Sequence, residues 1–280
     1  MYCDLHTHSI FSDGSLRPEQ IIAQAKERGL TVALTDHNTV SGLRDFMAAA
    51  NARGIRAIPG IEFSTTCHGQ ELHLVGLFIE PEHYDRLESV AEEFQRLKEQ
   101  SNREMIRRLN TAGYAIDYDE IRSRSPGGNI NRAHMGKALV RQGYVRSVQE
   151  AFETLLGEDL PFYVPCRRLE TTEAIRILRE IQAVPILAHP LQDLSEAELR
   201  QILPELMGAG LIAMETHHSS YDDATIALAS RIAGEFHLLP SGGSDFHGTA
   251  KPDIHLGVGK GNLHIPLSVL ENLEAARRQL

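Results

Sequence analysis

The sequence predicts an α/β fold: a (β/α) barrel of about seven strands, or a distorted relative of one, interrupted by a helical insertion. Short β-rich runs alternate with segments of helical periodicity over the first 80 residues, and the same alternation returns after the insertion. Between these parts only helical patterns remain. We therefore expect three segments: a first barrel part over 1–83, a helical insertion over 84–165 and a second barrel part over 166–280.

The first barrel part is expected to hold four strands and two helices. The strands are predicted at 2–6, 31–37, 55–63 and 71–79, and the helices at 18–29 and 41–54. Pro18 suits the first turn of a helix, where no N–H group is needed. Gly29 and Gly54 stand where the two helices should end, directly before the next strand.

The insertion is expected to be helical. Its helices are predicted at 87–113, 132–142 and from 147 onward, with a polar connection over 122–128. The apolar residues of the first segment repeat at helical spacing, which predicts one long amphipathic helix or two helices joined near Ser101. Ser147, with Glu150 three residues later, is a candidate capping box that opens the last helix.

The charge of the insertion differs from that of the rest of the chain. Between residues 96 and 146, 11 Lys and Arg stand against 5 Asp and Glu, whereas the whole chain has 28 basic and 38 acidic residues, a net charge of −10. A solvated helix face is the ordinary explanation of the basic run, and a lid that attracts an anionic substrate is the alternative. The acidic total argues against duplex DNA as a partner.

The second barrel part resumes the alternation of strands and helices. The strands are predicted at 183–190, 211–216 and 237–245, and the helices at 171–182, 194–210, 222–236 and from about 266. Together with the four strands of the first part, this gives about seven strands, most of them parallel.

Histidine is unusually frequent and cysteine is scarce, with 14 His and 3 Cys. Few and widely spaced cysteines argue against a disulfide scaffold and against a thiolate zinc finger. No stretch reaches the roughly 18 apolar residues that a membrane helix needs, and the first residues lack the basic and apolar regions of a secretory leader. We therefore expect a cytoplasmic protein without a membrane partner.

Nine histidine and acidic residues form the candidate metal site. His6 and His8 are two residues apart, so a strand would place both side chains on one face, and Asp245 and His247 repeat this spacing. Nearly all nine stand near the end of a β-run, where barrels place catalytic groups. The nine residues are His6, His8, Asp13, His37, Glu62, His73, His189, Asp245 and His247.

The ligand types indicate which ions the site would take. Imidazole and carboxylate ligands without a thiolate suit Mn, Fe or Zn better than Ca or Cu(I). Because nine ligands exceed what one ion needs, we expect two or three divalent ions, with Mn first among the candidates. Glu62 is the obvious bridge between them.

These motifs together resemble those of the PHP (polymerase and histidinol phosphatase) superfamily. In chain order they are HTH with the following Asp13, TDHNT, GIEF, ELHLVGLF, LAHP and GGSDFHG, and they span the chain apart from the insertion. The segment NRAHMGKALV of the insertion is similar to that of the subfamily that hydrolyses nucleoside 3',5'-bisphosphates and trims short RNA from the 5' end. The resemblance implies a distorted (β/α)7 barrel, the PHP fold, with a trinuclear metal centre.

The resemblance also implies how the ligands divide among three ions. The first ion would be held by His6, His8, Glu62 and Asp245, the second by Glu62, His73 and His189, and the third by Asp13, His37 and His247.

Candidates for substrate contact lie outside this set. Arg132 would form a forked contact with a phosphate, and His134 would contact a phosphate or protonate the departing oxygen; a surface helix is the alternative for both. His217 and His218 follow an expected strand, where substrate contact and local capping are equally good interpretations. His134 and Asp245 are the expected catalytic residues.

The expected reaction is metal-dependent hydrolysis of the 3'-phosphate of nucleoside 3',5'-bisphosphates. Trimming of short, single-stranded, 5'-phosphorylated RNA is the second expected activity. Two alternatives share the metal site: a histidinol phosphate phosphatase, against which the basic insertion argues because that substrate is cationic, and a non-catalytic metal-binding PHP module. Hydrolysis of C–N bonds is a third alternative, although no strand-end lysine is present to carry the carboxylate that related centres use.

Overall fold

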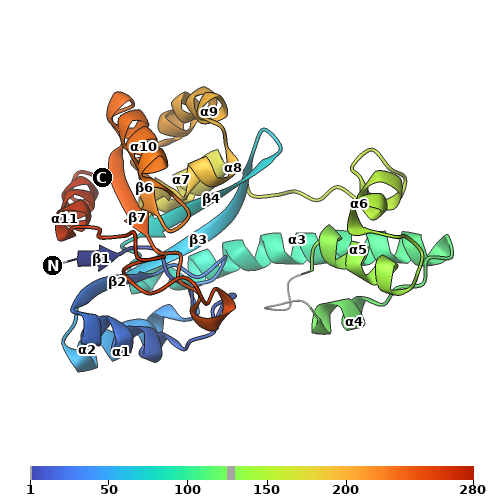
Figure 1. The fold of residues 1–280 in the computed structure, drawn as a ribbon, viewed down its shortest axis with the longest axis horizontal. Coiled ribbons are helices and arrows are strands. Elements are labelled where there is room, and N and C mark those ends of the chain that lie inside the picture. The colour runs from blue at the N-terminus through green and yellow to red at the C-terminus, as the bar shows by residue number, and fades with distance from the viewer. Residues whose placement is uncertain (1, 125–129) are drawn as a thin grey trace. The chain divides into compact units, whose positions relative to one another are not determined.

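Seven strands form one sheet in which neighbours in sequence are neighbours in space. The computed structural model describes residues 2–124 and 130–280. The strands are Tyr2–Asp4 (β1), Leu30–Leu34 (β2), Ala57–Cys67 (β3), Gln70–Leu77 (β4), Val184–Leu187 (β5), Ala213–His218 (β6) and Leu239–Gly243 (β7). The sheet curls until β1 meets β7, where the Leu5 N–H donates to the Gly242 carbonyl at 3.2 Å. The predicted α/β barrel is confirmed, and it is nearly closed (Figure 1).

One strand runs against the others. The pairs β1–β2, β2–β3, β5–β6 and β6–β7 are parallel, whereas β4 is antiparallel to both β3 and β5. The reason is local: β3 and β4 are joined by a tight turn at His68 and Gly69, which only an antiparallel pair can use. The start of β4 therefore lies at the same end of the barrel as the carboxyl ends of its neighbours.

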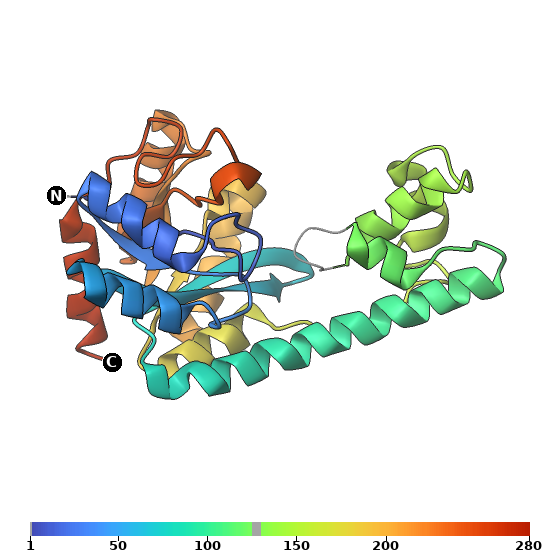
Figure 2. The same ribbon diagram turned by 90° about the horizontal axis from the view of Figure 1, so that it is seen from below.

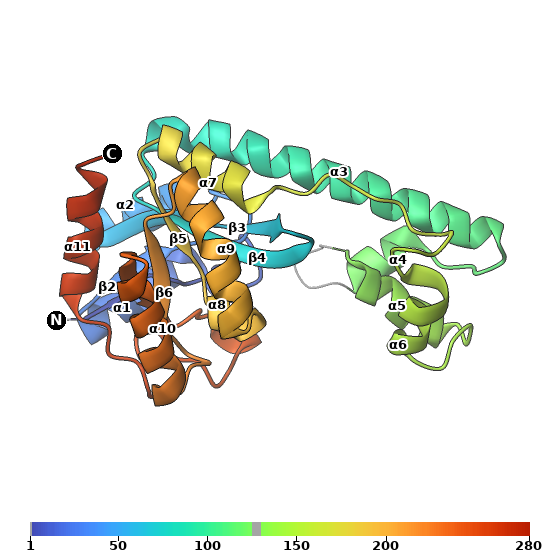
Figure 3. The ribbon, with the colours of Figure 1, turned by 90° about the horizontal axis from the view of Figure 1, so that it is seen from above.

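Helices cover the outside of the barrel. They are Pro18–Arg28 (α1), Leu43–Arg53 (α2), Thr171–Glu180 (α7), Pro190–Asp193 (α8), Glu196–Ala209 (α9), Asp223–Glu235 (α10) and Leu267–Arg277 (α11), with short turns at Pro81–His83 and Gly248–Ala250. The helices α1 and α2 lie side by side (Figure 2), as do α7 and α9 (Figure 3). As predicted, α1 and α2 end at Gly29 and Gly54, both in the left-handed conformation. No helix of the described ranges combines the length and apolarity needed to cross a membrane.

The helix α11 closes the barrel at the end where the parallel strands begin. Its Val269, Leu270 and Leu273 pack into a buried apolar cluster with Cys3 and Val184, which lie near the starts of β1 and β5. Because this end is filled by side chains, the opposite end is the one left for polar groups.

Backbone contacts divide the chain into two compact units, which we call the barrel unit (Met1–Ala91 with Leu169–Leu280) and the helical unit (Glu92–Arg168). Helical elements near or within the second unit are Tyr84–Thr111 (α3), Tyr118–Ser123 (α4), Arg132–Arg141 (α5), Val148–Ala151 (α6) and the turn Phe152–Leu156. The helix α3 is continuous through Ser101, so this segment is one long helix and not two helices joined there. The helical unit has its own apolar core, which includes Met105, Leu139 and Leu156.

The start of α6 carries only part of the expected capping box. Ser147 caps α6 by accepting from the Glu150 N–H, but the Glu150 carboxylate accepts from the Arg146 N–H at 2.6 Å instead of from Ser147. The predicted capping box is thus only half formed, because Glu150 is occupied by the backbone and guanidinium of Arg146. The polar connection expected over 122–128 lies mostly outside the described residues.

Candidate metal centre

The nine predicted ligands all lie in one cluster in the barrel unit. After β1 the chain stays extended, so His6 and His8 point to the same side while Thr7 between them bridges to Phe246. Glu62 lies within β3, which continues to Cys67, and not near the strand end as the sequence suggests. His73 lies near the start of β4, where the predicted strand placed it. His73 still reaches the centre because β4 runs in the reverse direction.

Glu62 occupies the middle of the cluster. Its Oε2 lies 3.1 Å from His6 Nε2, 3.2 Å from His8 Nε2 and 3.0 Å from His37 Nδ1. Its Oε1 lies 3.0 Å from His73 Nδ1 and 3.2 Å from His189 Nε2. Each carboxylate oxygen thus faces a different group of imidazoles, which is the arrangement that a bridging carboxylate requires.

Two further carboxylates extend the cluster on the side of His8. Asp245 Oδ1 lies 3.2 Å from His8 Nε2, and Asp13 Oδ1 lies 3.1 Å from His247 Nε2. The ligand atoms fall into groups close enough to share an ion: His8, Asp13, His37 and His247; His6, His8 and Asp245; His6, Glu62 and His189; and His37, Glu62 and His73. These groups overlap with the three ligand sets implied by the resemblance without being identical to them, so the division among ions stays a prediction.

Unpaired polar atoms show that divalent ions fit this cluster. Among the described residues, nine buried side-chain N or O atoms lack a hydrogen-bond partner, and all except Thr66 Oγ1 belong to this cluster or to the adjoining His218. A buried polar atom without a partner is costly, and a metal–ligand bond removes that cost. Asp245 and His189 also adopt positive φ angles of 55° and 29°, strain that is typical of functional sites.

The cluster combines carboxylates of lowered pKa with imidazoles whose pKa values are shifted in opposite directions. Burial raises the pKa of Glu62, but the surrounding His37, His6 and His73 outweigh it and hold the pKa well below its usual value. Burial lowers the pKa of His8, yet its contacts with Asp245 and Glu62 raise the pKa to about 9. Burial dominates for His37 and lowers its pKa to about 3. The negative charge at the centre therefore attracts cations, whether protons or metal ions.

Two buried carboxylates outside the ligand set fix the loops that carry the ligands. Asp4 accepts from the Ser244 N–H at 2.8 Å and from the Gly257 N–H at 2.7 Å, which ties β1 to the loop after β7. Asp36 accepts from the Ser9 N–H at 2.7 Å and from the Ser12 hydroxyl at 2.6 Å, which shapes the loop that presents Asp13.

Glu215 is a functional residue that the sequence analysis missed. It lies in β6, is buried, and accepts from His6 Nδ1 at 2.8 Å and from the His189 N–H at 2.7 Å. It thereby fixes His6 with Nε2 free to bind an ion. Its place near the end of the predicted strand 211–216, two residues before His217, is the signal that could have identified it.

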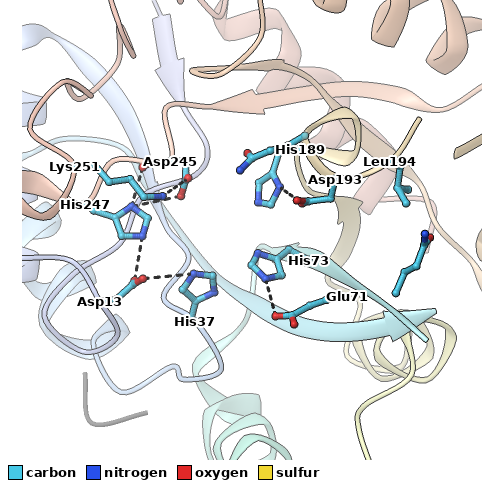
Figure 4. A pocket seen from close by; sticks show the side chains of 12 residues that line it. Asp13, His37, Glu71, His73, His189, Asp193, Leu194, Asp245, His247 and Lys251 are labelled. Atoms are coloured by element: carbon cyan, nitrogen blue, oxygen red, sulfur yellow. Dashed lines mark hydrogen bonds and ion pairs between the residues drawn. The ribbon is translucent and has the colours of Figure 1, made fainter. Parts of the chain in front are cut away.

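A cavity of about 540 Å³ opens beside the cluster (Figure 4). The predicted ligands Asp13, His37, His73, His189, Asp245 and His247 line it. Its remaining lining residues are Gln70, Glu71, Gln192, Asp193, Leu194 and Lys251. The volume is that of an ordinary small-molecule site.

The PHP domain model matches residues 4–158 of the sequence, more than half of the chain. The chain belongs to the PHP family. A 5'-3' exoribonuclease from Haemophilus influenzae is 31% identical over 87% of this chain and 89% of its own length. A 3',5'-nucleoside bisphosphate phosphatase from Chromobacterium violaceum is 30% identical over 87% of this chain and 86% of its own length. A solved structure described as a metal-dependent phosphoesterase, from Bifidobacterium adolescentis, covers 98% of this chain with a TM-score of 0.70 at 24% identity, which shows the shared fold.

These similarities support a metal-dependent phosphoesterase of the PHP family. The cluster of nine residues in this chain brings imidazoles and carboxylates together in groups that could each hold a divalent ion. The predicted family, fold and class of chemistry are therefore confirmed.

The predicted substrate residues lie in different places. His218 is buried, 3.6 Å from Asp245 Oδ2, and its Nδ1 contacts the Ser220 hydroxyl at 2.8 Å. His217 is half-buried with its Nδ1 2.8 Å from the Thr216 hydroxyl. Neither residue lines the cavity of the PHP centre as the described residues define it, so their role in substrate binding stays a prediction.

Arg132 and His134 lie in the helical unit at the start of α5. Arg132 pairs with Glu158 at 2.8 Å and stacks on Tyr163, so its guanidinium already has a partner. The Nδ1 of His134 accepts from the Asn131 N–H at 3.3 Å. Burial, with the nearby Lys137 and Lys98, lowers the pKa of His134. A neutral His134 would then carry its proton on Nε2, where it can donate.

Proposed function

We propose that the protein removes the 3'-phosphate from nucleoside 3',5'-bisphosphates with the help of two or three divalent ions, Mn being the first candidate. The observation that carries the proposal is Glu62 placed between two groups of imidazoles, which suits more than one ion. The bisphosphate phosphatase from Chromobacterium violaceum, similar over most of both chains, supports the choice of substrate.

The residues that would hold the ions are those of the cluster. When bound, the ions would neutralise the phosphoryl oxygens and activate water for attack on phosphorus. Asp245 is catalytic in this proposal because it joins the ligand cluster to the cavity, with Oδ1 facing His8 and Oδ2 facing Lys251. His134 is proposed to donate a proton from Nε2 to the departing ribose oxygen.

Trimming of short RNA from a phosphorylated 5' end is the second candidate activity. The similarity to the exoribonuclease from Haemophilus influenzae favours it. In the helical unit, several arginines are paired with acids of the same helix, such as Arg103 with Glu99 and Arg107 with Glu104. Some basic side chains of that unit are therefore already paired with acids, which favours short single strands over long ones as substrates.

The substrate is tested by phosphate release from adenosine 3',5'-bisphosphate and from histidinol phosphate, with Mn supplied. We expect release from the bisphosphate and little from histidinol phosphate, and activity on histidinol phosphate alone would overturn the proposal. Asp245→Asn should abolish turnover while the circular dichroism spectrum stays that of the wild type. If the wild type turns over neither substrate yet binds a partner protein, the non-catalytic alternative would apply.

A further inference from the structure

Lys251 is the single lysine or arginine among the described residues that line the cavity of the metal centre. It follows the short turn Gly248–Ala250 after β7 and lies on the same side of the cavity as Asp245 and His247 (Figure 4). Every other charged or ionisable lining residue is an acid or a histidine. A phosphate dianion that enters the cavity therefore meets one permanent side-chain cation.

The ammonium group of Lys251 has N–H donors that its contact with Asp245 does not use. Its Nζ lies 2.6 Å from Asp245 Oδ2, and among the described residues Asp245 is its ion-pair partner. A lysine ammonium has three N–H donors and no acceptor, so two donors stay available. The side chain is 41% exposed, which leaves these donors open to the cavity and its solvent.

The backbone beside Lys251 is fixed to the loop that carries Asp13. The Thr249 N–H donates to the Ser15 hydroxyl at 2.7 Å, and this hydroxyl donates to the His247 carbonyl at 3.2 Å. Gly248 has a φ of 64°, and a β-carbon there would collide with Ser15 Oγ, so only glycine fits this close approach. Lys251 is thus presented from a fixed turn, as a residue that must meet a ligand at a set position would be.

The opposite side of the cavity has the reverse polarity. Glu71 lies 3.7 Å from His73 Nε2, and Asp193 lies 3.9 Å from His189 Nδ1, both at the cavity wall. Figure 4 shows these two acids across the cavity from Lys251. Such a wall repels a phosphate dianion and accepts hydrogen bonds from hydroxyl or amino groups. The two sides together orient a phosphomonoester with its phosphate toward Lys251.

We propose that Lys251 forms a phosphoryl-binding subsite, in which its Nζ donates to a non-bridging oxygen of the substrate phosphate while keeping its contact with Asp245. The inference rests on the proposed phosphoesterase function and adds to it the residue that binds the phosphate. A role limited to holding Asp245 in place is the competing explanation.

The test is the binding of inorganic phosphate to the manganese-loaded protein by isothermal titration calorimetry, with metal content measured on the same samples. For Lys251→Met we expect a dissociation constant for phosphate raised by about 10- to 100-fold, as the loss of a charge-assisted hydrogen bond predicts, with unchanged metal content. Lys251→Arg should recover part of the affinity. Lys260→Met, which alters an exposed lysine outside the cavity, is the matched control and should bind phosphate like the wild type.

Three results would overturn the inference: no measurable phosphate binding by the wild type, unchanged phosphate affinity in Lys251→Met, or a loss of affinity that follows a loss of metal. The last would assign Lys251 to the positioning of Asp245. Because phosphate is the product of any phosphomonoesterase, its Lys251-dependent binding can be found even if the bisphosphate is not a substrate. Failure of the proposed function and failure of this inference are therefore distinguishable.

Discussion

The buried carboxylates of the barrel divide into two kinds according to what faces them. Glu62 and Asp245 face imidazole nitrogens, several of which have no hydrogen-bond partner. Asp4, Asp36 and Glu215 face N–H and O–H donors that satisfy them. A carboxylate of the first kind is suited to an ion, whereas one of the second kind holds backbone and ligands in place.

Glu215→Gln should weaken metal binding although Glu215 is not a proposed ligand. One glutamate oxygen accepts from His6 Nδ1 and the other from the His189 N–H, so the NH2 group of glutamine would have to face a donor on one side. We expect metal affinity to fall by about 10- to 100-fold, measured by metal content after equilibrium dialysis. Glu271→Gln, at an exposed site on α11, is the control and should bind metal normally. Equal metal affinity in the two variants would contradict the assigned role of Glu215.

Metal binding should release protons and strengthen as pH rises. Burial lowers the pKa of His8 and His73, but nearby carboxylates outweigh it and raise the pKa to about 9 and about 10, so both hold protons at pH 7 in the metal-free protein. An ion binds only the neutral imidazole, and each bound proton must leave first. Affinity is therefore expected to fall from about pH 9 toward pH 6. Calorimetry in buffers of different ionisation enthalpy measures the release, and heats independent of the buffer would contradict the expectation.

At the scale of single residues, the sequence predicted which side chains gather in the cluster better than it predicted the contacts that other residues make with them. All nine predicted ligands lie in the cluster. Glu215 escaped because its partner His6 lies 209 positions away in the sequence. Lys251 is only six residues from Asp245, but no sequence pattern shows that its side chain lines the cavity. No periodicity indicates which buried acid accepts from a histidine and which lysine faces a cavity.

Among the elements, β4 decides the shape of the site. A parallel β4 would have put His73, near its start, at the end of the barrel that α11 fills. The reversed strand instead places His73 opposite Ser64 of β3, two residues from Glu62. Strand patterns in the sequence located β4, but its direction followed from the tight turn before it.

Gly243→Ala should disturb both the barrel closure and the metal centre. A β-carbon on Gly243 would lie 2.5 Å from His6 N and 2.8 Å from His6 Cα, so β1 and β7 would have to move apart. We expect a loss of about 1–3 kcal/mol in the free energy of unfolding and a reduced metal content. Urea unfolding with a chelator present measures the first quantity.

Gly208→Ala is the matched control for this substitution. Gly208 lies in α9 with nothing within 4 Å of its added β-carbon, so alanine should be neutral or stabilise by up to about 1 kcal/mol. Equal stability of the two variants would show that β1 and β7 are not tightly packed at Gly243.

On the scale of the molecule, each unit has its own apolar core, and the charges are unequally divided. The insertion is basic between residues 96 and 146, whereas the chain as a whole has a net charge of −10. The acidic remainder includes the carboxylates that would be neutralised by divalent ions.

The salt dependence of RNA binding should reveal whether the helical unit contacts the strand. If it does, the slope of log affinity against log salt should steepen with oligonucleotide length, by about 0.7 for each additional phosphate contacted. Replacing Lys98 and Lys137, the two lysines that lower the pKa of His134, with glutamine should flatten the slope for longer oligonucleotides and leave that of a mononucleotide unchanged. A slope that is independent of length in the wild type would restrict the helical unit to other roles.

The sequence by itself determined the α/β class, the order of the elements and the set of candidate imidazole and carboxylate ligands, because strand periodicity, helix ends and the spacing of these residues are local properties of the chain. The tertiary structure decided that Glu62 lies at the centre, that β4 runs in reverse, and that Glu215 contacts His6 while Lys251 contacts Asp245. These features depend on residues such as His6 and Glu215, which lie 209 positions apart and meet only when the barrel closes.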